Sequence, residues 1–204
     1  STRTEGSMIS SLADLLEWLL RRATWISRLG IWAGGLLMMA AVVMIAVEIL
    51  MRRTLGWTFR GAHELSSYVL AISAAWSFAF ALLEKAHIRV DVLYVRLKPR
   101  LRALLDLLAM TLMGLFLLVL VQQAFGVLST SIARSSTANT PLATPLWIPQ
   151  VLWWSGLAWF AIVTLLLWLR ILVALLASDF GRIQELAGSR TLEEEISEYQ
   201  ESEA

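Results

Sequence analysis

The chain has 204 residues, of which 58% are hydrophobic and only 16% charged. A soluble domain of this size could bury only part of so many hydrophobic residues, so a membrane protein is the first interpretation. A formal net charge of +1 argues against a nucleic-acid partner, and the absence of cysteine excludes disulfides, thiolate metal sites and thiol redox chemistry.

The N-terminal segment, residues 1–28, contains an amphipathic pattern. Met8 can serve as a native start, so residues 1–7 carry no weight in the predicted fold. Apolar side chains then recur at helical spacing, interrupted by charged ones: Ile9, Leu12, Leu15, Leu16, Leu19, Leu20, Ala23 and Ile26. The pattern predicts a helix that lies along a membrane interface or packs on a partner subunit, and both alternatives stay open.

Four later segments are apolar enough to cross a hydrocarbon layer of ~30 Å, which takes about 20 helical residues. They are residues 29–51, 65–83, 107–128 and 151–170. The alternation of a barrel strand is absent, and a backbone in lipid must satisfy its own hydrogen bonds, so each segment is expected to be a helix. The predicted fold class is an all-α membrane protein, with a four-helix domain over residues 29–177 and an acidic tail over residues 178–204.

Basic residues predict the orientation of these helices. Thirteen of the 17 lie before the first span, between the second and third, or after the fourth, and four lie on the other side: Arg52, Arg53, Arg60 and Arg134. Both termini are therefore expected in the cytoplasm. Interfacial tryptophans would then form two belts, an outer one of Trp57, Trp147, Trp153 and Trp154 and an inner one of Trp25, Trp32 and Trp168.

Two carboxylates lie near the ends of spans. Glu48 precedes Arg52 by four residues, the favourable order for a helical ion pair that fixes the depth of the helix. The alternatives are a proton- or ligand-coupled carboxylate, as in small dimeric exporters, and a contact with a partner. Glu64 precedes the second span, where an unpaired carboxylate is costly, so we expect it to pair with Arg52, Arg53 or Arg60, or to dock a partner.

Other polar features have structural explanations. The second span has a face of small residues that favours close helix packing, within the bundle or with another subunit: Ser66, Ser67, Ala71, Ser73, Ala74, Ala75, Ser77 and Ala81. Three prolines predict an extended outer loop over residues 135–150. Five basic residues of the second connection either set the topology or bind anionic lipid head groups: Lys85, Arg96, Lys98, Arg100 and Arg102.

The sequence offers no catalytic chemistry. The spans lack a Ser, His and Asp arrangement and a metal-binding cluster, so no catalytic, metal-binding or substrate-binding residue and no cofactor is predicted. The two histidines, His63 and His87, bracket the second span and are about 36 Å apart along a helix, so one chain cannot use both for a single haem. Such a protein is expected to work as part of a complex.

The order and spacing of several short motifs resemble the small membrane subunit (DctQ type) of tripartite ATP-independent periplasmic (TRAP) transporters. The resemblance covers residues 29–176, including the segment TPLWIP at residues 144–149. The common family form has glycine immediately before the histidine that corresponds to His87, where this chain has Ala86. The residues that carry the resemblance are Glu48, Arg52, Trp57, Glu64 and Tyr68, followed by His87, Arg89 and Asp91 with Leu93.

The resemblance implies a non-catalytic subunit of a sodium-coupled secondary transporter in the bacterial inner membrane. Its partners would be a large multispan subunit, which carries the substrate and sodium sites, and a periplasmic protein that delivers a small organic acid or related solute. The small subunit would brace the large one and help to dock the binding protein, at Arg52, Arg53, Arg60, Arg134 and Trp147. Two other functions stay open: a dimeric stand-alone exporter, and the membrane anchor of a redox complex.

Overall fold

The computed structural model describes residues 2–84 and 99–176. This part of the chain contains four helices: α1 (Thr2–Leu55), α2 (Ala62–Leu83), α4 (Pro99–Ala133) and α5 (Trp147–Leu176). Each includes a stretch long and apolar enough to cross a membrane. The described residues form no strand, apart from an isolated antiparallel bridge between Thr137 and Pro145. The predicted all-helical class with four spans is confirmed.

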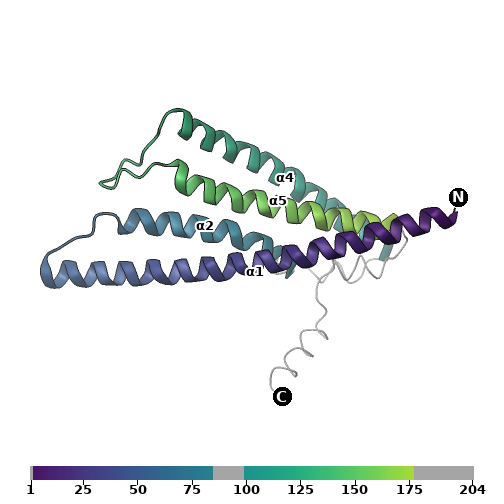
Figure 1. The fold of residues 1–204 in the computed structure, drawn as a ribbon, viewed down its shortest axis with the longest axis horizontal. Coiled ribbons are helices and arrows are strands. Elements are labelled where there is room, and N and C mark those ends of the chain that lie inside the picture. The colour runs from purple at the N-terminus through teal and green to yellow at the C-terminus, as the bar shows by residue number, and fades with distance from the viewer. Residues whose placement is uncertain (1, 85–98, 177–204) are drawn as a thin grey trace, which may run out of the picture.

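The helices lie in a row, in the order α4, α5, α2 and α1 (Figure 1). Each contacts its neighbours in the row, and α1 also contacts α5. The α1–α2 and α4–α5 connections lie at one end of the bundle, which we call the loop end (residues 52–61 and 134–147). The N-terminus lies at the opposite end. Because α5 contacts three helices, it forms the centre of the protein.

Small residues let α2 approach both of its neighbours. The Ser73 hydroxyl donates a hydrogen bond of 3.1 Å to the carbonyl oxygen of Gly34 in α1. On the other side, a Cβ atom at Gly156 of α5 would lie 2.9 Å from the Cβ atom of Ala75. Ser73 and Ala75 are buried, whereas Ala74 is exposed. Part of the predicted small-residue face therefore serves packing within the bundle. Helices in lipid gain no hydrophobic driving force on association, so close van der Waals packing stabilises their contact instead.

Helix α1 differs from the prediction. The sequence pattern places a separate interfacial helix before residue 29, but a single helix runs from Thr2 to Leu55. Its 54 residues correspond to a length of about 80 Å. The segment contains no proline that would break the helix. Its buried side, which includes Leu20 and Ala23, joins a cluster with Ile171 and Ala174 of α5. Part of the apolar stripe thus packs within the chain, whereas Leu12 and Leu15 of the same stripe are exposed.

Four tryptophans link helices that are in contact with one another through their indole N–H groups. Such a bond satisfies a donor that would be costly to bury alone. Trp154 and Trp168, two of the tryptophans predicted to lie in interfacial belts, are half-buried and take part in these bonds. The acceptors are the Leu152 carbonyl oxygen for Trp76 (3.1 Å), the Val121 carbonyl oxygen for Trp154 (3.2 Å), Ser27 Oγ for Trp159 (2.9 Å) and Thr111 Oγ1 for Trp168 (2.9 Å).

Candidate functional site

A buried carboxylate at the loop end connects α2 to the α4–α5 loop. Glu64 lies in the first turn of α2 and is only 7% exposed. The Tyr68 hydroxyl, one helical turn later, donates a hydrogen bond of 2.9 Å to Glu64 Oε1. The Thr140 hydroxyl donates to Glu64 Oε2 from the loop, and Thr144 adds bonds from its side chain and its backbone. We call Glu64, Tyr68, Thr140 and Thr144 the loop clasp.

The loop has a defined backbone of its own. The Ala138 N–H donates to the Thr144 carbonyl oxygen at 2.9 Å, and the Leu146 N–H donates to the Ser136 carbonyl oxygen at 3.0 Å. These bonds fold the loop back on itself. Ala143 takes a positive φ of 48° at the turn. The loop is therefore a compact structure rather than the extended segment that its prolines predict.

A second contact holds the loop on α2. Gly61 is the N-cap residue of this helix, and the Leu142 side chain lies against it. A Cβ atom at Gly61 would lie 2.2 Å from Leu142 Cδ1, a distance that real side chains do not reach. The absence of a side chain at Gly61 thus lets the loop seat beside the loop clasp.

The predicted ion pairs of Glu64 and Glu48 are not formed. The part of the chain that the structure describes pairs no arginine with Glu64, whose oxygens accept hydroxyl hydrogen bonds instead. Glu48 is half-buried and makes no ion pair with Arg52 in the same part. Since a pair between exposed groups contributes only about 0–1 kcal/mol, the solvated Arg52 loses little by staying apart.

The five predicted docking residues all lie at the loop end and are exposed. Arg52 and Arg53 are in the last turn of α1, and Arg60 is in the α1–α2 connection. Arg134 follows α4, and Trp147 begins α5 with 46% of its surface exposed. Trp57 of the family motif is also exposed, at 62%. The loop end therefore presents arginines and aromatic rings, while its carboxylate Glu64 is buried.

The opposite end contains an ion pair that sequence reasoning missed. Arg170 in α5 is only 3% exposed, and its Nη2 atom lies 2.7 Å from Glu17 Oε1 in α1. The two residues are 153 positions apart. The available signals were a charge at the end of the fourth span and an opposite charge in the amphipathic segment. Nothing in the sequence joins these two signals.

Several family-motif and lipid-contact predictions lie outside the described residues: Lys85, His87, Arg89, Asp91, Arg96 and Lys98. Arg100 and Arg102 belong to α4, but the structure does not describe their side chains. Within residues 2–84 and 99–176, no group of three or more His, Asp or Glu residues could hold a metal ion.

Comparison with known families supplies the decisive observation. Residues 41–174 match the family described as "Tripartite ATP-independent periplasmic transporters, DctQ component". The chain belongs to the DctQ family. No curated protein and no solved structure matches it.

The DctQ match covers the loop end and its clasp. It confirms the resemblance and makes this chain a membrane component of a TRAP transporter. The match begins inside α1, so Glu17 lies outside it, whereas Arg170 lies within it.

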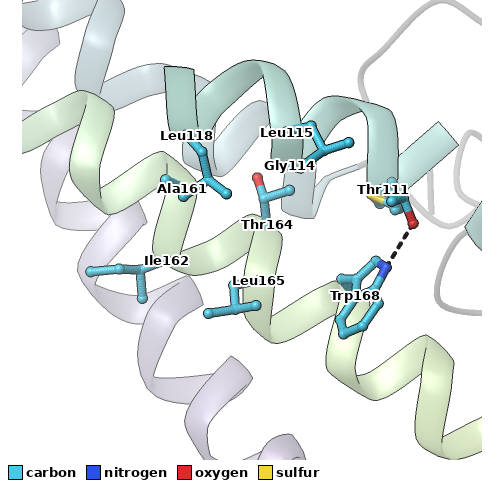
Figure 2. Close-up of a pocket in the computed structure, with 10 residues that line it drawn as sticks. Thr111, Gly114, Leu115, Leu118, Ala161, Ile162, Thr164, Leu165 and Trp168 are labelled. Carbon is cyan, nitrogen blue, oxygen red and sulfur yellow. Dashed lines mark hydrogen bonds between the residues drawn. The ribbon is translucent and has the colours of Figure 1, made fainter. Parts of the chain in front are cut away.

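The DctQ chain also has an apolar groove between α4 and α5 (Figure 2). Its volume is about 340 Å³. The hydrogen bond from Trp168 to Thr111 spans the groove at one end. Its lining is Met110, Thr111, Gly114, Leu115, Leu118, Ala161, Ile162, Thr164, Leu165 and Trp168. Because none of these residues is charged, the groove fits apolar groups and lacks a counter-ion for an organic acid.

The loop clasp of this DctQ chain leads to a first prediction. Replacing Thr140 with valine removes a hydrogen bond to a carboxylate, and we expect trypsin to cleave after Arg134 about tenfold faster, because such bonds are stronger than neutral ones. Limited proteolysis of the purified chain measures this rate. Thr137→Val is the control, since the Thr137 hydroxyl makes no hydrogen bond within the described residues. Equal rates for the two variants would show that the clasp does not hold the loop.

Proposed function

We propose that this DctQ chain is the non-catalytic small subunit of a sodium-coupled TRAP transporter in the bacterial inner membrane. The transporter takes up a small organic acid or related solute. Its large subunit carries the substrate and sodium sites, and this chain braces it. The observation that carries the proposal is the family match over residues 41–174. The uncharged lining of the groove between α4 and α5 supports the same division of labour.

A bracing role requires a rigid part, and the contacts of the bundle support one. Interhelical hydrogen bonds from Trp154, Trp159 and Trp168 connect α5 to α4 and α1. Trp76 connects α2 to α5, and the buried Arg170 ties α5 to α1. Each bond is modest, about 0.6 kcal/mol on average between membrane helices, but together they oppose sliding of one helix past another.

In this proposal the loop end faces the periplasm and receives the binding protein. Arg52, Arg53 and Arg60 are exposed there, and the loop clasp fixes the neighbouring loop in one shape. These exposed positive charges would attract an acidic surface of the binding protein, and they would raise the association rate more than the affinity of the complex. A loop already ordered before binding reduces the entropy lost on docking.

Uptake in proteoliposomes tests the proposal. We expect solute uptake from the large subunit, the binding protein and this chain together, and none when this chain is left out. Replacing Arg52, Arg53 and Arg60 by alanine should raise the half-saturating concentration of binding protein about tenfold, because three rim charges steer the encounter. Changing Arg21 and Arg28, exposed arginines near the opposite end, should have no effect.

The other outcomes identify the alternatives. Uptake that does not need this chain would overturn the bracing role. Export by the chain alone, abolished by Glu48→Gln, would support the exporter. A haem spectrum in the purified chain would support the redox anchor. A solute that binds the isolated chain in calorimetry would contradict a subunit without a substrate site.

A further inference from the structure

Helix α4 lies at the edge of the row and has an outward face that no described helix covers (Figure 1). Its opposite side is buried against α5 and includes Leu117, Ala124 and Leu128. The outward face carries a stripe with alternating spacings of four and three residues. We call this stripe the α4 seam: Leu112, Phe116, Val119, Gln123, Gly126 and Thr130.

The spacing of the α4 seam is that of a helix–helix contact. Alternating steps of four and three keep one stripe facing a second helix that crosses at a small angle. The three apolar members are well exposed, at 58% for Leu112, 62% for Phe116 and 59% for Val119. No described residue of the chain covers this stripe.

Gln123 argues against acyl chains as the only neighbours of the α4 seam. The apolar stretch of α4, Leu104–Ala133, has 30 residues, or a length of about 45 Å, and Gln123 lies about 15 Å from its loop end. That depth is inside a hydrocarbon layer of ~30 Å centred on the stretch. Gln123 is exposed, and no hydrogen bond joins its amide to another described residue. Acyl chains cannot bond an amide, so its donors and acceptor would stay unsatisfied in lipid.

The hydroxyls of the same face do not share this problem. The Thr130 hydroxyl donates to the Gly126 carbonyl oxygen at 2.8 Å, and the Ser129 hydroxyl donates to the same oxygen at 3.0 Å. These groups are satisfied within α4 and tolerate an apolar neighbour. Gln123 is thus the polar group of the seam that calls for a partner outside the chain.

Gly126 provides room for a close approach. A Cβ atom added there would meet nothing within 4 Å. The glycine lies in an open depression of about 470 Å³ whose lining also includes Gln123 and Thr130. Glycine and threonine four residues apart form a small-residue pair of the kind that lets two membrane helices bring their backbones together.

We propose that the α4 seam binds a transmembrane helix of the large membrane subunit. This inference rests on the proposed function, which supplies a multispan partner in the same bilayer. The partner helix should carry a small residue opposite Gly126 and a hydrogen-bonding side chain opposite Gln123. Gln123 then sets the register, as single polar residues do in coiled coils, and the apolar members supply the packing area.

Co-purification of the transporter tests the seam. With a tag on this chain, we expect Gly126→Leu to abolish recovery of the large subunit, because leucine fills the depression. Gln123→Leu should lower recovery about threefold, the effect of one membrane hydrogen bond. Gly35→Leu is the matched control, since a Cβ atom at Gly35 also meets nothing within 4 Å. It should leave recovery unchanged.

A photo-crosslinking residue in place of Phe116 gives a second measurement that does not depend on complex stability. We expect an adduct with the mass of this chain plus the large subunit, and no adduct from the same residue at Val43, an exposed position of α1. If the wild-type chain recovers no large subunit, the proposed function fails. If it does, but Gly126→Leu recovers as much or Phe116 gives no heteromeric adduct, the seam assignment alone is wrong. An adduct of two copies of this chain would assign the seam to a homodimer instead.

Discussion

Replacing Gly156 with valine is expected to force α5 away from α2. A Cβ atom at this position would lie 2.8 Å from Trp76 Cδ1 and 3.0 Å from the backbone carbon of Ala75. Two further methyl groups find no space, and a shift of Trp76 would break its hydrogen bond to Leu152. Overpacking of this kind costs about 3 kcal/mol. The midpoint of thermal unfolding in detergent, followed by tryptophan fluorescence, should fall accordingly.

The control for Gly156→Val is Gly114→Val. Both changes replace a helical glycine by the same residue, but a Cβ atom at Gly114 meets nothing within 4 Å. We expect the unfolding midpoint of Gly114→Val to stay at or above that of the wild type, since helix propensity favours valine over glycine. A similar loss of stability in both variants would show that the close contact at Gly156 is not its cause.

Removing Glu17 is expected to have the second largest effect. Glu17→Met leaves the Arg170 guanidinium buried without the carboxylate that lies 2.7 Å from it. Breaking a fully buried pair costs about 3–5 kcal/mol, and we expect about 2 kcal/mol here. The lower figure follows because the Glu17 side chain is 35% exposed, so water screens part of the interaction. The unfolding midpoint in detergent again measures the loss.

A double variant distinguishes the effect of losing the ion pair from the effect of leaving Arg170 buried without a partner. Replacing both Glu17 and Arg170 by methionine removes the buried charge along with its partner, and such changes are often neutral or stabilising. We therefore expect the double variant to regain most of the stability that Glu17→Met loses. Asp14→Met, at an exposed acidic residue of the same segment, should change little. If the double variant is less stable than the single one, Arg170 has another stabilising role.

The membrane spans were predictable because their signal is local. A run of about 20 apolar residues is enough to identify a membrane helix, and the four runs lie within α1, α2, α4 and α5. The beginning of α1 was not predictable in the same way. An amphipathic pattern fits an interfacial helix as well as a helix packed on another. The contact of Leu20 and Ala23 with α5 joins distant parts of the chain, so the local pattern does not reveal it.

The partners of Glu64 show why the site was predicted only in part. Its place at the start of the second helix and its contact with Tyr68 follow from a spacing of four residues. Sequence reasoning then chose the nearest opposite charges, whereas Thr140 reaches Glu64 from 76 residues away. A hydroxyl is a weak signal in a sequence, because serine and threonine occur in most loops. Only the folded loop shows that two threonines converge on one carboxylate.

The unbroken α1 helix has a mechanical consequence. Its 54 residues make a rod of about 80 Å, much longer than the ~30 Å of a hydrocarbon layer. Gly30 and Gly34, where the rod could otherwise bend most easily, lie against Trp76 and Ser73 of α2. Farther toward the N-terminus, Ser27 and Glu17 are bonded to Trp159 and Arg170 of α5. Because α1 is fastened at several points along its length, we expect it to move with α2 and α5 as one body rather than to bend on its own.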